Sequence, residues 1–308
     1  MMRYKNLQLH KKHFLSFTGL TVAEFNKLLN KIRADWLNQR IERLNKNNPN
    51  RQRKIGGGRK QKLENLEDQL LLALVWARLY PTYLLLEYLF NIDESTVCRT
   101  IINMTLLLQN KFILPERNRR KISTIEELKD IIPDLDVILG DATEQKIPRP
   151  LKNRKRQKHH SGKKKAFTVK TQIATNKQGL IIHVSKSIPG RKHDYKLFKE
   201  SQLPQKIPKG IKLYLDSGYQ GVNKDFPGLD AIIPFKRTRN HKELTRSEKI
   251  HNTKQRKIRV AVEHAIARLK KYQALAQIYR HSLQNYGQTF RFIANIANFR
   301  MLQRIPVS

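Results

Sequence analysis

The first part of the chain follows the apolar periodicity of α-helices. Apolar residues recur at helical spacing over residues 23–33, and Thr21 stands three positions before Glu24, the pattern of a capping box. We therefore expect a helical segment over residues 1–45. Residues 46–62 are rich in Gly, Asn, Lys and Arg, which predicts a flexible basic linker.

The next segment is more apolar and predicts a DNA-binding domain over residues 63–120. One buried helix is expected over residues 66–76 and a second over 82–90, followed by a short turn at 91–95 in which Ser95 caps a third helix. This is helix–turn–helix spacing, although an ordinary small helical bundle has the same pattern. The residues expected to face DNA bases are Thr96, Arg99 and Thr100.

After Pro133 the pattern changes to short apolar strands. Strands are expected at residues 135–140, 166–173, 180–185, 212–215 and 231–234, with helices starting near 193, from about 247 to 272, and near 286–302. This order predicts an α/β RNase H-like catalytic core, a mixed sheet with helices, over residues 134–308, although other mixed sheets fit too. An all-α helix–turn–helix domain precedes it.

The charge of the chain points to a polyanionic partner. The 308 residues include 62 Lys and Arg against 25 Asp and Glu, a formal net charge of +37. Nucleic acid is the first candidate, which favours the DNA-binding interpretation of the helix–turn–helix over the plain bundle. A membrane is the rival anion, but no apolar run reaches the roughly 18 residues of a spanning helix.

Further features of the sequence limit the kinds of site and the cellular location that are expected. Cys98 is the only cysteine, so neither an internal disulfide nor a cysteine-based zinc site is expected. The first residues are followed by no signal-peptide pattern. The glycines at 56–58 lack the spacing of a phosphate-binding loop, so no nucleotide is expected as partner. These features predict a cytoplasmic protein that acts on nucleic acid.

Three acidic residues stand out in so basic a chain. Asp141 and Asp216 each directly follow an apolar strand, at the strand ends where α/β active sites form. Glu263 is flanked by apolar residues, which predicts a position near the buried face of its helix. Singly, each is explained by a turn or an ion pair. Together they suit Mg²⁺, which prefers carboxylates with water and phosphate, and two such ions support phosphoryl displacement.

Four separated segments carry a resemblance to a known family. They are Gly140–Glu144, Pro189–Asp194, Leu215–Gly221 and Arg259–His264. Together they resemble the DDE transposases, in particular bacterial insertion-sequence family five of the Harbinger-type superfamily, and residues 63–110 resemble that family's helix–turn–helix. The resemblance implies an RNase H-like fold, a catalytic and metal-binding triad of Asp141, Asp216 and Glu263, two Mg²⁺ (with Mn²⁺ as a substitute), and cutting and joining of DNA.

The last segment resembles the family pattern Y-x2-R-x3-E-x6-K. Arg259, Glu263 and Lys270 match it, whereas Arg256 stands at the Tyr position, a departure that affects binding of the DNA ends more than catalysis. Helical spacing puts Arg259, Glu263 and Lys270 on one face, so the basic residues are expected to hold phosphate while Glu263 holds metal. Charge pairing with Glu263 is the alternative.

Residues 152–165 form a basic run just after the first predicted strand. We expect Lys155, Arg156, Lys163 and Lys164 to contact the phosphate backbone, the alternative being a solvated surface. Glu144 is interpreted as a loop cap, with an auxiliary metal ligand as the alternative. Asp194 is interpreted as the N-cap of a helix, with a position near the metals as the alternative.

Transposition by this family implies particular partners. The expected ones are double-stranded DNA, as terminal inverted repeats and as target, and a second copy of the chain in a homodimer or larger assembly on DNA. The expected setting is the bacterial cytoplasm, at the nucleoid. The strongest alternative is a catalytically inactive, transposase-derived protein that binds specific DNA without cutting it, and the presence of all three acids speaks against it.

Overall fold

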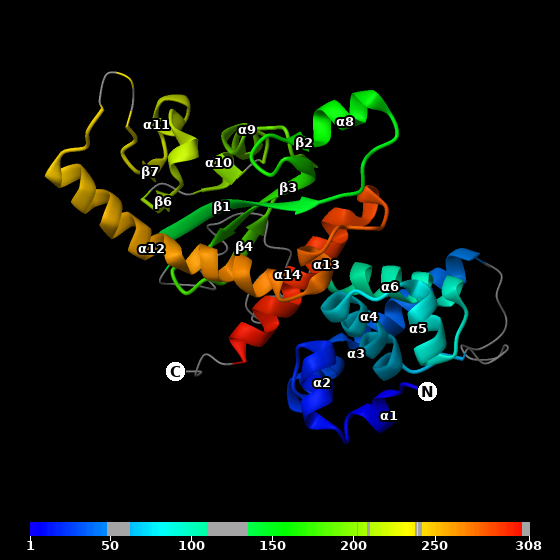
Figure 1. Cartoon of the computed structure of the whole chain (residues 1–308). Coiled ribbons are helices and arrows are strands. Elements are labelled where there is room, and N and C mark those ends of the chain that lie inside the picture. Colours follow the sequence, from blue (N-terminus) through cyan, green and yellow to red (C-terminus); the bar gives the residue numbers. More distant parts are fainter. Residues whose placement is uncertain are drawn as a thin grey trace. The chain divides into compact units, whose positions relative to one another are not determined.

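The computed structural model describes residues 1–47, 62–109, 135–201, 203–207, 210–237, 239 and 242–303. They form two compact units (Figure 1). The first comprises the described residues of Met1–Lys111, Lys271–Ala276 and Gln288–Ser308, and the second those of Phe112–Lys270 and Gln277–Gly287. No helix in these ranges is long and apolar enough to span a membrane.

The described part of the first unit is helical, as predicted. Its elements are α1 (Tyr4–Leu7), α2 (Lys11–Thr18), α3 (Val22–Asn47), α4 (Leu66–Leu79), α5 (Tyr83–Phe90), α6 (Glu94–Leu108), α13 (Gln273–Ala276) and most of α14 (Tyr286–Leu302). The capping box of α3 is confirmed, because the N–H of Thr21 donates to Glu24 Oε2 (2.7 Å) and the N–H of Glu24 donates to Thr21 Oγ1 (3.1 Å). Most of the predicted linker, residues 48–61, lies outside the described residues.

The predicted helix–turn–helix is formed by α5 and α6. The side chain of Thr82 caps α5 by accepting from the N–H of Leu85 (3.2 Å), and Asn91 ends that helix in the left-handed conformation at φ 48°. The prediction that Ser95 caps the next helix is wrong. The helix begins at Glu94, whose N–H donates to the Glu87 carboxylate (2.7 Å), so Ser95 lies inside the first turn.

The second unit is built on a mixed sheet. Its strands are β1 (Val137–Lys146), β2 (His160–Ser161), β3 (Ala166–Thr175), β4 (Ile181–Val184), β5 (Ile188–Pro189), β6 (Lys212–Tyr214) and β7 (Asp230–Ile232). The order is β2-β3-β1-β6-β7, with β4 and β5 also pairing with β3. Strands β1, β3 and β4 are antiparallel neighbours, whereas β1, β6 and β7 are parallel. This pattern is RNase H-like and confirms the predicted fold class.

The first strand is longer than predicted. We expected it to end at Gly140, yet β1 continues to Lys146 and pairs with β3 from Leu139 opposite Thr175 to Lys146 opposite Thr168. The residues 141–146 are mostly polar and lack the apolar alternation of a strand, so only the partner strand reveals them. As a result, Asp141 lies within a strand and not at its end.

Helices cover both faces of the sheet. The second unit contains α8 (Asn153–His159), α9 (Asp194–Glu200), α10 (Leu203–Lys206), α11 (Val222–Asp225), α12 (Arg246–Lys270) and the 3-10 turns η1 (Ser217–Tyr219) and η2 (Leu283–Asn285). Helix α12 packs against β1 and β3, and α9 also packs against β3 (Figure 1). An apolar core that includes Ile138, Ala174, Phe198 and Leu213 lies between the sheet and α9 and α10.

The compact units divide the chain differently from the expected boundaries. The segments 1–45 and 63–120 were expected to be separate, but their described residues fall into one unit. Residues 288–303, expected in the domain 134–308, join them. Arg300 lies 3.7 Å from the carboxylate of Glu24, and Asn295 Nδ2 donates to the carbonyl of Gln109 (2.6 Å).

Candidate functional site

Strand register brings Asp141 and Asp216 together. Strands β1 and β6 run parallel, and their last paired residues are Leu139 and Tyr214. Each aspartate lies two residues beyond that pair, so the two carboxylates occupy equivalent positions where the parallel pairing ends. Asp216 follows its strand as predicted and opens the turn η1.

Arg259 of α12 lies between these two aspartates. Its Nη1 is 3.2 Å from Asp216 Oδ1 and its Nη2 is 4.0 Å from Asp141 Oδ2. One turn earlier on the helix, the buried Gln255 donates through Nε2 to the carbonyl of Ile232 on β7, which fixes the helix against the sheet. Arg259 is itself buried, at 8% exposure. A buried guanidinium shared by two carboxylates is the electrostatic centre of this site.

The environment of Asp141 favours its neutral form. Burial raises the pKa of Asp141 to about 6, and the charges of Asp216 and Asp194 raise it further, whereas the N–H of Ala142 and the charge of Arg259 act in the opposite direction. The Ala142 N–H donates to Asp141 Oδ1 (2.8 Å). Asp141 is therefore a carboxylate that gains from any added positive charge.

Tyr219 lies in the apolar core, three residues after Asp216. It is 1% exposed, and its hydroxyl has no hydrogen-bond partner among the described residues. Burial first, and then the charges of Asp194, Asp141 and Asp216, raise its pKa well above the ordinary value. The hydroxyl thus lies within the field of three aspartates.

A second charged cluster lies on the other face of β1. Lys170 of β3 is 2.8 Å from Asp194 Oδ1 and 3.4 Å from Glu144 Oε1, and its Nζ also donates to the carbonyl of Lys192 (2.7 Å). Glu144 accepts a further hydrogen bond from the Thr168 hydroxyl (2.8 Å). The two proposed capping roles are wrong: Glu144 is a strand residue bound to Lys170, and His193 is the N-cap of α9, with Asp194 the first helical residue.

The prediction that Glu263 lies near the buried face of its helix is wrong. The buried stripe of α12 is formed by Gln255, Arg259, Val262, Ala265 and Leu269, and Glu263 is exposed beside it. Apolar neighbours in sequence misled the prediction, because adjacent helical residues point about 100° apart. Within the described ranges, no three acidic, His or Cys side chains lie close enough to hold a metal ion together.

The two aspartates nevertheless fit a hard divalent cation. Their oxygens are ligands that Mg²⁺ prefers, and Mg²⁺ commonly uses one or two carboxylates while retaining water. The structure already places one positive charge, the Arg259 guanidinium, between them. Glu263, the predicted third ligand, does not form a group of three metal ligands with the two aspartates.

A basic cleft of about 410 Å³ opens beside Asp216 and Arg259. Its lining includes three exposed cationic side chains, those of Lys236, Arg237 and Arg256. The loop before α12 is held in place by Asn252, which accepts from the N–H of Phe235 (2.8 Å) and donates to its carbonyl (3.0 Å). Arg256 was predicted to bind DNA, whereas Lys236 and Arg237 were missed because their loop carries no recognisable pattern.

Five further basic residues predicted to bind DNA lie elsewhere in the second unit. Lys155 and Arg156 lie on α8, and Lys163 and Lys164 are exposed after β2. Lys270 donates through Nζ to the carbonyl of Glu144 (3.2 Å), and burial, then the charge of Lys164, lower its pKa to about 8. Of these cations, Lys270 is bonded to β1, and Lys164 lies close enough for its charge to act on Lys270.

The residues predicted on the recognition helix are only partly available. Arg99 is exposed and bonds Ser95 through both its Nε and Nη2, and Thr96 is partly exposed. Thr100 is 7% exposed, so the prediction that it faces a base is wrong. It lies on the same side of α6 as the core residues Val97, Ile101 and Met104.

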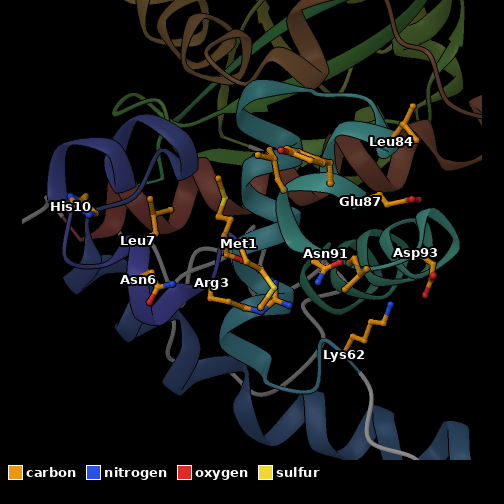
Figure 2. A pocket seen from close by; sticks show the side chains of 14 residues that line it. Met1, Arg3, Asn6, Leu7, His10, Lys62, Leu84, Glu87, Asn91 and Asp93 are labelled. Carbon is orange, nitrogen blue, oxygen red and sulfur yellow. The ribbon is translucent and has the colours of Figure 1, made fainter.

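A second cavity, of about 960 Å³, lies in the first unit (Figure 2). It is lined by residues of the N-terminal segment and of α5, among them Met1, Arg3, His10 and Leu84, and by Lys62. None of the residues predicted for catalysis or DNA contact lines it.

Comparison with known proteins gives two family matches and two relatives. Residues 140–298 match the DDE superfamily endonuclease, and residues 61–112 match the helix-turn-helix of that superfamily. The chain is 30% identical over 299 residues, 96% of its length and 97% of the relative's, to a probable transposase for insertion sequence element IS702 of Microchaete diplosiphon. It is 26% identical over 259 residues, 84% of each chain, to a putative transposase for IS112 of Streptomyces albus G. These matches confirm the predicted resemblance at the level of the superfamily.

Proposed function

The chain belongs to the DDE superfamily of endonucleases, and we propose that it is a transposase that cuts DNA at the terminal inverted repeats of a mobile element. The observation that carries this proposal is the pair of strand-register aspartates, Asp141 and Asp216, which share one buried arginine beside a basic cleft. The matched helix-turn-helix and endonuclease domains point to DNA as the partner.

In the proposed reaction, water first hydrolyses a phosphodiester at the element's end and frees a 3′-OH. That hydroxyl then attacks a phosphodiester of target DNA, so one bond forms as another breaks and no nucleotide is consumed. Asp141 and Asp216 would hold Mg²⁺ or Mn²⁺. Divalent ions bound there would activate the attacking oxygen and stabilise the leaving oxygen. We propose two such ions, with Glu263 as the third acid by its place in the family motif.

The basic residues of the second unit would position the DNA backbone. Arg256, Lys236 and Arg237 line the cleft beside Asp216, and a guanidinium matches a phosphate with two parallel hydrogen bonds. Elsewhere in the second unit we assign phosphate contacts to Lys270, Lys164, Lys163, Lys155 and Arg156. On α6, Arg99 and Thr96 are the proposed base contacts.

The setting follows from the reaction. Two element ends must be cut together, so we propose a homodimer or larger assembly on DNA. We place the activity in the cytoplasm of a bacterial host, at the nucleoid.

The test is nicking and 3′-OH joining on a duplex that carries the element's terminal repeat, in Mg²⁺, Mn²⁺ or EDTA. The variants are Asp141→Asn, Asp216→Asn and Glu263→Gln. Asp136→Asn is the matched control, because Asp136 precedes the same strand but is exposed and paired with Lys177. We expect metal-dependent cutting to fall at least about 100-fold in each of the three variants, a loss of roughly 2.7 kcal/mol of transition-state stabilisation. The variants should still bind DNA in EDTA, and cutting by the control should be unaffected.

Other results would change the assignment. A parent protein that binds the repeat but never cuts it would identify the chain as a catalytically inactive DNA-binding descendant. Cutting that survives Glu263→Gln alone would remove Glu263 from the site and retain the two aspartates.

A further inference from the structure

The guanidinium of Arg259 places a positive charge beside the two aspartates, where a bound metal ion would place its own. The guanidinium reaches Asp216 at 3.2 Å and Asp141 at 4.0 Å, the two acids proposed to hold a divalent cation. Two cations cannot share one pair of carboxylates without mutual repulsion, which is strong in a partly buried site. In the free protein the guanidinium therefore competes with a metal ion for these aspartates.

The contacts of Arg259 with the aspartates leave it able to exchange partners. The 4.0 Å separation from Asp141 is too long for a hydrogen bond, and the buried Nε of Arg259 has no hydrogen-bond partner in the described part of the chain. Other contacts also hold α12 in place, since Gln255 donates to β7 one turn earlier and Val262, Ala265 and Leu269 of the helix are buried. The Arg259 side chain therefore has an unused donor on a helix that is also held by other residues.

The cleft beside Arg259 offers the alternative partner. Asp216 and Arg259 both line it, together with the exposed cations Lys236, Arg237 and Arg256. A phosphate group drawn into this cleft would be a better partner for a guanidinium than a carboxylate 4.0 Å away, because it accepts two parallel hydrogen bonds.

We propose that Arg259 is a positioning residue that occupies Asp141 and Asp216 in the free protein and transfers to a backbone phosphate when DNA enters the cleft. DNA binding and divalent-cation binding at the two aspartates then strengthen each other. The coupling is reciprocal by thermodynamic necessity, so it can be measured from either side. The inference rests on the proposed function for the identity of the two ligands, but it requires no cleavage.

The experiment measures Mn²⁺ binding to the full chain by electron paramagnetic resonance, with and without a mixed-sequence duplex. The Asp141→Asn/Asp216→Asn double variant supplies the background from other Mn²⁺ sites. Without DNA we expect Arg259→Gln to bind Mn²⁺ about tenfold more tightly than the parent, because a competing charge is removed. Arg259→Lys, which keeps the charge, should lie between the two.

The matched control is Arg256→Gln. Arg256 lines the same cleft and carries the same charge, but it is exposed and makes no ion pair with either aspartate. Without DNA, we expect it to change Mn²⁺ affinity by less than about threefold, the scale of an exposed charge interaction.

The coupling itself is read as the effect of Mn²⁺ on the affinity for a fluorescently labelled duplex. We expect Mn²⁺ to tighten binding of the parent about tenfold and of Arg259→Gln less than about twofold, within the usual range of coupling between sites. The parent measurement stands even if the variant fails to fold. Mn²⁺ that binds at the aspartates of the parent without any coupling to DNA overturns this inference and leaves the proposed function intact. Mn²⁺ binding that the double variant does not reduce overturns both.

Discussion

In the described part of the second unit there are two places where one cation lies between two carboxylates, and they differ in how completely the cation is bound. Lys170 is 7% exposed in its side chain and contacts Asp194 at 2.8 Å, Glu144 at 3.4 Å and a backbone carbonyl at 2.7 Å. Arg259 is similarly buried, yet it reaches only one carboxylate at hydrogen-bond distance, at 3.2 Å, and the second at 4.0 Å.

This difference in bonding distinguishes the Lys170 cluster, which stabilises the fold, from the Arg259 cluster, which can bind a ligand. Lys170 Nζ lies within 3.4 Å of three oxygens from three different residues, so its ammonium group has little to gain from exchanging them. Arg259 retains an unbonded Nε, and the Asp216 side chain beside it is 48% exposed. The first cluster ties α9 to β3, whereas the second is open to ligands on one side. A buried ion pair by itself does not identify an active site; unsatisfied donors and access to a cleft do.

The largest expected effect comes from breaking the closed cluster. Lys170→Met leaves Glu144 and Asp194 without their shared cation, and removing one partner of a buried pair costs about 3–5 kcal/mol of unfolding free energy. Urea denaturation of the parent and the variant measures the loss. For Arg259→Gln we expect a smaller loss than for Lys170→Met, because the 48% exposed Asp216 is compensated by solvent and only Asp141 is left buried without a nearby cation.

Lys177→Met is the matched control for this comparison. Lys177 also pairs with an aspartate, Asp136, but both side chains are more than half exposed, at 51% and 59%. Exposed pairs contribute about 0–1 kcal/mol, so this variant should resemble the parent. Equal losses for Lys170→Met and Arg259→Gln would remove the distinction between the two clusters.

A smaller effect is expected in the pH dependence of stability. Asp141 has a folded pKa of about 6, above the ordinary value of 3.8, so the folded chain binds more protons between these values than the unfolded chain does. Its contribution to the unfolding free energy therefore decreases as pH rises from about 4 to 6 and is smallest above that range. Asp141→Asn removes this decrease, so its stability relative to the parent should grow by about 2–3 kcal/mol over the same window.

At Asp136 the unfolding free energy is expected to change with pH in the opposite direction, which Asp136→Asn tests. The hydrogen bond from Lys177 is the main cause that lowers the pKa of Asp136, so this pair stabilises the chain at neutral pH and is lost as pH falls through the acid range. Metal-free urea denaturation across the acid range tests both variants. If the difference in unfolding free energy between Asp141→Asn and the parent does not change with pH, the pKa of Asp141 is not raised.

The smallest expected effect concerns Lys270. Burial lowers its pKa to about 8, so in the free protein its charge disappears as pH rises past that value. If Lys270 contacts phosphate, the slope of log affinity against log salt should become shallower by about 0.9 across this range, the contribution of one neutralised phosphate. Lys270→Arg, which stays charged, should keep a constant slope. An unchanged slope in the parent would exclude Lys270 from the DNA interface.

Much of the architecture was predictable because it depends on local patterns. Helical periodicity located α3 to α6, and the capping box at Thr21 and Glu24 identified where α3 begins. Apolar runs located β3, β4, β6 and β7, and their order favoured the RNase H-like interpretation, although other mixed sheets fitted it too. The two aspartates were found because each follows an apolar run in a basic chain.

The errors arose where a residue's surroundings come from distant segments. Thr100 and Glu263 were assigned to the wrong faces, because which side of a helix is buried depends on its packing partners. The second half of β1 was missed because β3, not its own composition, holds it in the sheet. The Lys170 cluster joins β1, β3 and α9, which no sequence spacing connects.

By itself, the sequence determined the element types, their order, the family motifs and the two aspartates, since all of these are encoded in neighbouring residues or in the identity of a side chain. The tertiary structure alone decided that Asp141 and Asp216 share Arg259, that Lys170 lies between Glu144 and Asp194, and that Glu263 is exposed. The reason is physical. Charge–charge contacts act over a few ångströms, and only strand register and helix packing bring residues more than 40 positions apart, such as Asp216 and Arg259, within that range.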